Sequence, residues 1–199
     1  MTDDALVAAL VELEHHVGEA GWNQPARLFA LVRTDELIEA EPELAAHLGL
    51  RSSADGHPVD ALSSIEQDEF RSVGTGEGEA AAESALEQVL GRLTWPDAVA
   101  GCALAVERSF LPARFEADLP EDPAAAETFV AEHPDRQDLR LIVGVLRGGA
   151  AHCFARLVSN PGELLSGPDL APGVVSVLAA TLEHDRPGHR LHQDSRRTT

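Results

Sequence analysis

The feature that most constrains the fold is a pair of glycines between two β-like segments. Residues 139–147 and 150–159 are rich in Val, Leu and other strand-forming residues, and Gly148-Gly149 lies between them. Two such segments joined by Gly-Gly are typical of a β-hairpin with a two-residue turn. Such a turn places Arg147 opposite Ala150 and thereby sets the pairing of every residue farther out. The sequence therefore predicts an antiparallel C-terminal hairpin.

This register also predicts which side chains share a face of the hairpin. Val145 is expected opposite His152, and Leu141 opposite Arg156. If that face is buried, Arg156 needs a carboxylate partner, because an unpaired buried charge is strongly destabilising. If the face lines a cleft, His152 and Arg156 become anion-binding groups. The apolar residues expected on the same face are Leu141, Val143, Val145 and Phe154.

The remaining elements follow from hydrophobic periodicity and from capping signals. Strands are expected over residues 26–33 and 99–108, the second with one face of mainly small residues. Ser63 and Glu66 fit a capping box for a short helix that reaches about Phe70. Thr34 is expected to cap another helix. Further helices are expected over residues 3–19, 42–48, 80–93, 123–133 and 169–182, and loops over 50–60 and 160–168.

Together these elements predict an α+β fold with two layers. A sheet of about four strands would carry the antiparallel hairpin (139–147/150–159), packed by the N- and C-terminal helices. We expect a single domain over residues 1–183, with a loop-rich insertion at 50–80 and a disordered polar tail at 184–199.

Charge narrows the range of partners. The formal net charge is −19, and all 15 basic residues are arginines. Such a chain repels phosphate backbones and acidic membrane surfaces, so we expect neither nucleic acid nor membrane as a partner. The acidic start lacks a signal peptide, which favours a cytoplasmic location. Cys102 and Cys153 fall in predicted strands and are expected to be reduced core residues.

The chemical motifs are weak. Trp95-Pro96-Asp97 followed by His152-Cys153 is similar to the signature of tyrosine phosphatases, but Ser159 occupies the position where that mechanism needs an arginine. Cys153 also lies within a predicted strand, where nothing lowers its pKa. His15 and His16, with their glutamate neighbours, supply too few ligands for a metal site. The sequence predicts no cofactor, no metal and no catalytic residue.

Three functional hypotheses remain open. The first is a non-catalytic protein-binding or adaptor domain, the second a small-molecule enzyme, and the third a homo-oligomeric structural protein. The partner would be an unknown protein or a second copy of the chain. The sequence favours the absence of enzymatic activity without deciding it. The residues that could line a ligand pocket are Asp97, Glu107, Arg108, His152 and Arg156.

Several stretches resemble a known family. They are GWNQPARLFALV (21–32), LTWPDAVAGCALAVER (93–108), HPDRQDLRLIVGVLRGGAAHCFARL (133–157) and SGPDLAPG (166–173). These resemble a family of actinobacterial proteins that is known by a locus-tag name and has no assigned function. The resemblance implies a cytoplasmic, single-domain protein and carries over no catalytic residue.

Overall fold

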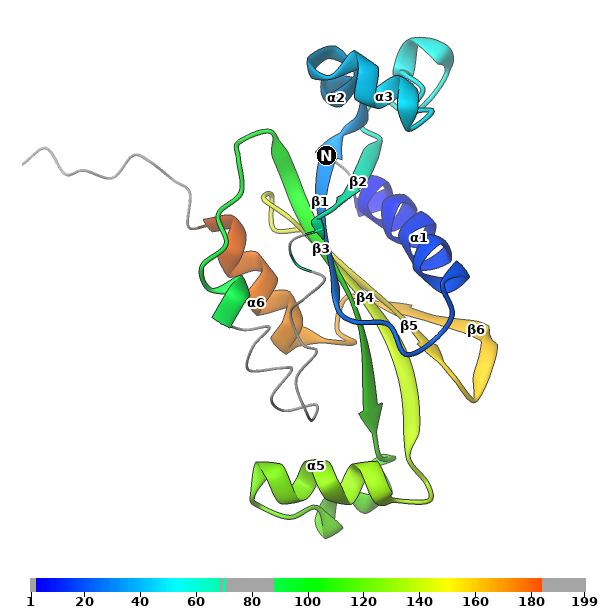
Figure 1. The fold of residues 1–199 in the computed structure, drawn as a ribbon, viewed down its shortest axis with the longest axis vertical. Coiled ribbons are helices and arrows are strands. Elements are labelled where there is room, and N and C mark those ends of the chain that lie inside the picture. The colour runs from blue at the N-terminus through cyan, green and yellow to red at the C-terminus, as the bar shows by residue number, and fades with distance from the viewer. Residues whose placement is uncertain (1–2, 69, 71–87, 184–199) are drawn as a thin grey trace, which may run out of the picture.

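Within the residues that the structure describes, six strands form one antiparallel sheet in the order β2-β1-β3-β4-β5-β6. The structure is a computed structural model that describes residues 3–68, 70 and 88–183 (Figure 1). The strands are β1 (Arg27–Arg33), β2 (Leu62–Glu66), β3 (Val99–Phe110), β4 (Gln137–Leu146), β5 (Ala151–Leu157) and β6 (Asn160–Gly167). The helices are α1 (Asp3–Glu19), α2 (Thr34–Ala40), α3 (Pro42–His47), α5 (Pro123–Glu132) and α6 (Pro172–Glu183), with short 3-10 helices η1 (Ser53–Asp55) and η3 (Ala113–Asp118).

Helices α1 and α6 lie on opposite faces of the sheet (Figure 1). Leu6, Leu10 and Leu13 of α1 pack on one face, and Leu178 and Leu182 of α6 pack on the other. The α+β class with packed N- and C-terminal helices is confirmed. The sheet is larger than the four strands expected. Because a helix lies on each face, the sheet is the middle of three layers, whereas two layers were expected.

Small residues bring α1 close to the sheet. Ala103 and Ala105, from the face of β3 that has mainly small residues, pack in the same core cluster as the leucines of α1. Gly144 of β4 lies directly beneath the helix, where an added Cβ would stand 2.6 Å from a terminal carbon of Leu10. This separation is far below the ~3.5–4.0 Å of a normal carbon–carbon contact, so only glycine fits at this position.

The hairpin exists, but its predicted register is wrong by one residue. Leu146 N donates to Ala150 O at 2.9 Å, and Gly149 adopts φ +88°, so the loop comprises residues 147–149. A loop of this length, closed by a left-handed glycine, is the next most common hairpin type. Since a slip of one residue moves every partner to the opposite face, Gly144 rather than Val145 lies opposite His152.

The same slip changes the surroundings of Arg156. Arg156 pairs with Arg140 instead of Leu141, and its face of the sheet is the one covered by α1. The apolar residues predicted beside it on β4, Leu141, Val143 and Val145, belong instead to the core under α6.

Three local predictions are also wrong. Ser63 and Glu66 lie in strand β2, which pairs with β1, and not at the start of a helix. Residues 160–167 form strand β6 rather than a loop. Thr34 begins α2 without capping it, because its hydroxyl is 2.9 Å from the Ser63 hydroxyl and no side chain caps this helix.

Some predictions fall on residues that the structure does not describe. They are the tail at 184–199, the last part of the loop-rich insertion at 50–80 and most of the helix expected over 80–93. Among the residues described, none of the helices combines the length and the apolar composition that a membrane span requires.

Strands β3 and β4 continue beyond their neighbours and form an arm. The β1–β3 pairing ends at Arg27 and Ala105, whereas the β3–β4 pairing continues to Phe110 and Gln137. We call residues 107–139 the arm. Its tip consists of η3 and α5, which stand away from the rest of the sheet (Figure 1). None of the side chains described in the arm is buried.

Candidate functional site

A cleft of about 330 Å³ opens where the arm joins the body. It lies between the turn after α1, the two arm strands and the end of β5. Its lining residues are Trp22, Asn23, Glu107, Arg108, Ser109, Arg136, Asp138, Leu139 and Val158. Glu107 and Arg108, two of the five residues predicted to bind a ligand, therefore meet at this cleft.

The turn after α1 is held against β3 by Glu107. Gly21 and Asn23 both have left-handed backbones, with φ values of +82° and +63°. Only glycine adopts this conformation without strain, although asparagine tolerates it better than most residues. The turn directs two backbone N–H groups at one carboxylate oxygen, so that Asn23 N and Gln24 N donate to Glu107 Oε2 at 2.7 and 3.3 Å.

Arg140 of β4 connects this turn to the sheet through its guanidinium group. Its guanidinium lies 4.4 Å from the centre of the Trp22 ring, and its Nη2 donates to Glu107 Oε1 at 3.1 Å and to Gly21 O. The side chain is only 3% exposed, and its Nε has no hydrogen-bond partner among the described residues. A cation over an aromatic ring contributes about 0.5–2 kcal/mol, which helps to offset this burial. Trp22 is thereby held as one wall of the cleft.

Lining residues from the arm strands connect the cleft to helix α5. Asp138 accepts from the Ser109 hydroxyl at 2.6 Å and from Arg136 Nη2 at 3.0 Å. Arg136 also donates through Nη1 to Ala131 O of α5 at 3.2 Å. One side chain therefore lines the cleft and contacts α5, so the two features form a continuous surface.

Arg156 lies outside the cleft and is paired with a glutamate. Its Nε and Nη2 donate to the two carboxylate oxygens of Glu14 at 2.6 and 2.7 Å, and it also donates to Pro161 O. Glu14 is buried on α1, and the hydrogen bonds to it raise the pKa of Arg156. This is the carboxylate partner that the sequence required if the face of Arg156 is buried.

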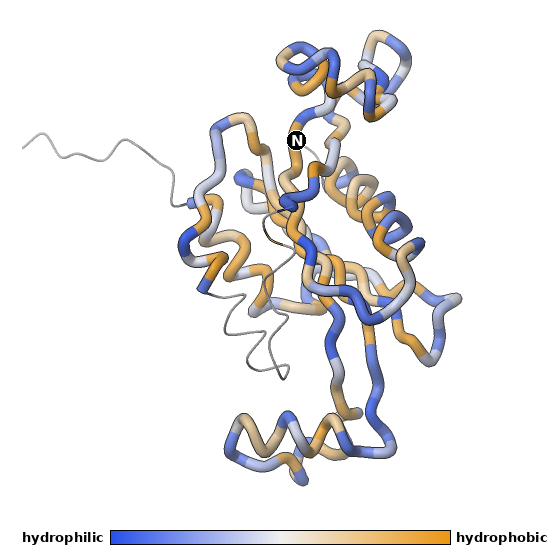
Figure 2. The backbone as a smooth tube through the Cα atoms, viewed as in Figure 1, coloured by the Kyte–Doolittle hydropathy of each residue, from blue (hydrophilic) through white to orange (hydrophobic). Residues whose placement is uncertain are grey.

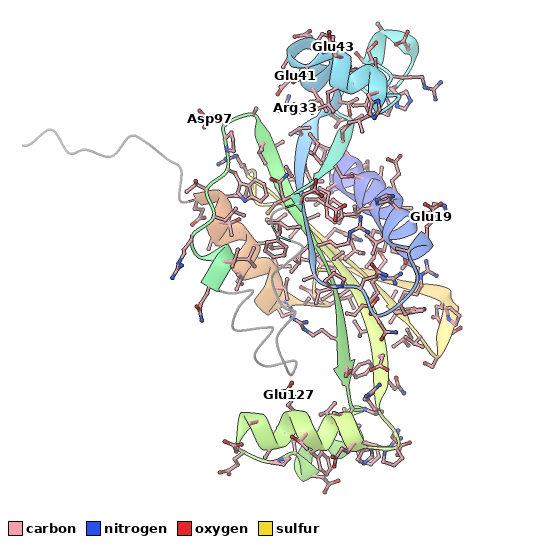
Figure 3. All side chains as sticks on the ribbon, viewed as in Figure 1. Glu19, Arg33, Glu41, Glu43, Asp97 and Glu127 are labelled. Atoms are coloured by element: carbon pink, nitrogen blue, oxygen red, sulfur yellow. The ribbon has the colours of Figure 1, made fainter. Side chains whose placement is uncertain are left out.

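His152 and Asp97 lie elsewhere. His152 Nε2 is 2.8 Å from the Ser166 hydroxyl of β6, and its ring packs at a tilt of 59° against that of Phe154, with centroids 5.0 Å apart. Asp97 is exposed in the connection that leads into β3, as Figure 3 shows. Neither residue lines the cleft with Glu107 and Arg108, so the five predicted residues do not share one pocket. Their role in ligand binding stays a prediction.

The Trp95-Pro96-Asp97 motif has a structural role here. Trp95 is buried, and its indole N–H donates to the Thr181 hydroxyl of α6 at 3.0 Å. Arg147 donates to the carbonyl oxygens of Trp95 and Val99 at 2.8 Å, and to Leu182 O of α6 at 2.7 Å. These contacts tie the connection before β3 to the last turn of α6.

Both cysteines are buried free thiols in strands, as expected. Burial raises the pKa of Cys153, and it raises the pKa of Cys102 to about 11. A phosphatase needs a thiolate, whereas these shifts keep both thiols protonated at neutral pH.

No group of three or more His, Cys, Asp or Glu side chains is placed to hold a metal ion in the part of the chain that the structure describes. His15 is 3.7 Å from the Glu19 carboxylate, and His16 is 3.2 Å from Arg27 Nη2. The two neighbouring histidines therefore contact different partners.

The sequence did not point to Trp22, Asp138 or Glu14. A signal exists for Glu14, because it is an acidic residue within the apolar stripe of α1, between Leu10 and Val17. Such a residue on the buried face of a helix requires a cationic partner. Nothing local marks Trp22, since its role depends on Arg140, far away in the sequence.

The comparisons with known proteins identify a family. Neither the curated proteins nor the solved structures include a match to this chain. Residues 6–183 match the family described as PPA1309-like protein, which covers all the strands and nearly all of α1. The chain therefore belongs to the PPA1309-like protein family.

Proposed function

We propose that this chain is a non-catalytic protein-binding domain, and that the arm with the cleft at its base is its binding site. The observation that carries the proposal is the arm itself. Residues 107–139 extend a helix away from the sheet, and none of their described side chains is buried within the chain. Figure 2 shows that α5 nevertheless carries apolar residues along its length.

The energetics of α5 support a partner. The helix has 10 residues, and Asp122 caps it by accepting from Ala125 N at 2.9 Å. Isolated helices shorter than ~12–15 residues are marginal in water, and a cap adds only about 1 kcal/mol. In the part of the chain that the structure describes, α5 makes few tertiary contacts, chiefly with β3. Burial of its apolar side chains against another protein would supply the missing stabilisation.

The arm does contain one small aromatic cluster. The His133 ring lies 4.5 Å from that of Phe115 and 5.4 Å from that of Phe129, measured between centroids. The Arg114 guanidinium lies over the Phe115 ring, 4.5 Å from its centroid. These side chains stay partly exposed. The cluster therefore presents an organised aromatic surface, and aromatic residues and arginine are enriched where binding energy concentrates in interfaces.

The cleft supplies the second part of the proposed site. Trp22 forms one wall, and its position is maintained by Arg140 and by the turn that Glu107 holds. A preorganised tryptophan beside a concave surface is typical of an anchor pocket for a side chain of a partner. The carboxylates of Glu107 and Asp138 already have hydrogen-bond partners, so they support the shape of the cleft.

Site-specific photo-crosslinking in the native cell tests this proposal. A photoreactive amino acid replaces Ala131 on α5 or, as a matched control, Ala8 on α1. Both are exposed alanines in helices. We expect position 131 to give a discrete crosslinked product with another protein, and position 8 to give none. Identical patterns from the two positions, or no product from position 131, would refute the arm as a binding site.

A further inference from the structure

We propose that the partner contacts the arm through a basic segment that also inserts an apolar side chain into the cleft. This inference rests on the proposed function and specifies the chemistry of the partner. It follows from the distribution of charge along the surface that runs from the cleft to α5.

The tip of the arm, residues 111–135, is strongly acidic. Seven acidic residues stand against one arginine, which leaves a net charge of −6. The arginine, Arg114, is already 3.2 Å from the Asp135 carboxylate. The acidic residues of the tip are Glu116, Asp118, Glu121, Asp122, Glu127, Glu132 and Asp135, and Figure 3 shows Glu127 among the side chains that project from α5.

The apolar part of the tip lies among these charges. Phe115, Phe129 and Val130 are half-buried, and Leu119 is 36% exposed. A partner that covers them must come within a few ångströms of the acidic residues, which is well inside the ~8 Å screening length of physiological salt. An acidic segment would be repelled there, whereas a segment with Lys or Arg beside its apolar residues complements the tip.

The cleft has a different charge balance from the tip. Its lining contains two acidic residues, Glu107 and Asp138, and two arginines, Arg108 and Arg136, so the charges balance. Trp22 adds an apolar wall. The part of the partner that reaches the base of the arm therefore meets no excess of negative charge. An apolar or aromatic side chain suits this position better than a further basic one.

A second copy of the chain does not fit this description. Each copy carries a net charge of −19, and two tips brought together would place two groups of −6 within one screening length. The described basic side chains of the body are largely engaged, since Arg27 pairs with Glu66 and Arg156 with Glu14. The charge pattern therefore favours a separate protein.

The test combines the crosslink at Ala131 with two double charge reversals that change the net charge equally. The arm variant carries Glu116→Lys and Glu132→Lys, and the control variant carries Glu12→Lys and Glu39→Lys. All four glutamates are exposed. Equal far-ultraviolet circular dichroism spectra and equal urea midpoints establish that both variants fold.

We expect the arm variant to lower the yield of the crosslink by about fivefold or more, because each reversal replaces an attraction by a repulsion. The control variant should stay within about twofold of the unmodified chain, since its charges lie outside the interface. Mass spectrometry of the crosslinked peptide should find more Lys and Arg than Asp and Glu in the partner segment.

The results that would overturn the inference can be told apart. A crosslink that persists equally in the arm variant, or that joins a neutral or acidic segment, refutes the basic segment and leaves the protein-binding function intact. Equal losses in both variants show attraction by net charge alone and also refute it. A product made of two copies of this chain overturns the separate partner. The absence of any product at position 131 overturns the inference and the proposed function together.

Discussion

A methyl group added at Gly144 should loosen α1 from the sheet. The Cβ of Gly144→Ala would lie 2.6 and 2.8 Å from the two terminal carbons of Leu10, and 3.0 Å from one of Leu6. Both leucines are at most 1% exposed, so neither has free space to enter. Overpacking of this kind destabilises by about 1–3 kcal/mol, and the gain of ~0.5–1 kcal/mol from replacing a strand glycine offsets only part of it.

Leu10→Ala provides the complementary change. On its own it should lower the free energy of unfolding by about 2–5 kcal/mol, because it leaves a cavity beneath α1. In the double variant the new methyl at position 144 enters that cavity and no longer clashes. The double variant should therefore lose less free energy of unfolding than the sum of the two single losses, with a coupling energy of about 1–2 kcal/mol.

Urea unfolding followed by circular dichroism measures all three free energies. Gly148→Ala serves as the matched control, because nothing lies within 4 Å of the added Cβ and its φ is not positive. It should change stability by less than about 0.5 kcal/mol. If Gly144→Ala were as neutral as this control, or if the double variant were additive, the close approach of α1 to β4 would be refuted.

Three further predictions concern other buried polar groups. Arg156→Ala should destabilise by about 3–5 kcal/mol, because it leaves Glu14 buried without a partner, and replacing both by leucine should restore most of that loss in urea unfolding. The raised pKa of Cys102 should add stability that is present below pH 9 and lost between pH 9 and 11, a fall of about 2–3 kcal/mol that Cys102→Ala should lack. The chain has no Tyr and no Lys, so the main other group expected in that range is Cys153, whose pKa is also raised, and Cys153→Ala serves as the comparison. Trp95→Phe and Thr181→Val should each lower the thermal midpoint by removing about 1 kcal/mol, and the double variant should lose little more than either single one.

Local sequence signals predicted the elements that carry clear periodicity or caps. Helices α1, α5 and α6 and strands β1, β3, β4 and β5 all lie where the sequence placed them, within a few residues. The errors at β2 and β6 share a physical cause. Residues Leu62–Glu66 fit a capping box and an edge strand equally well, and pairing with β1 and the Arg27–Glu66 ion pair decide between them. β6 contains Pro161 and Gly162, which are tolerated because it is an edge strand.

The register error shows why the candidate site was only partly predictable. Two adjacent glycines are typical of a two-residue turn, whereas of the two only Gly149 has a positive φ, and Arg147 also belongs to the loop. Because of this difference of one residue, Arg156 lies opposite Arg140, which in turn lies opposite Glu107. It does not lie beside the apolar residues of β4 as expected. A carboxylate partner was expected only if the face of Arg156 is buried, and buried Glu14 of α1 is such a partner. The identity of the partner depended on the approach of α1, which no local signal contains.

The arm arises from a difference in strand length that is visible in the sequence only in retrospect. β3 has 12 residues and β4 has 10, whereas the strands that flank them, β1 and β5, have 7 each. Past Ala105 on β3 and Leu139 on β4 the pair loses its outer neighbours, so it leaves the sheet as a two-stranded ribbon. An isolated two-stranded hairpin is marginally stable in water. The contacts at its base therefore become essential, and they are the ones that Glu107, Arg140 and Asp138 make. The same groups that anchor the arm shape the cleft, so under the proposed function a partner bound in the cleft would also stabilise the arm above it.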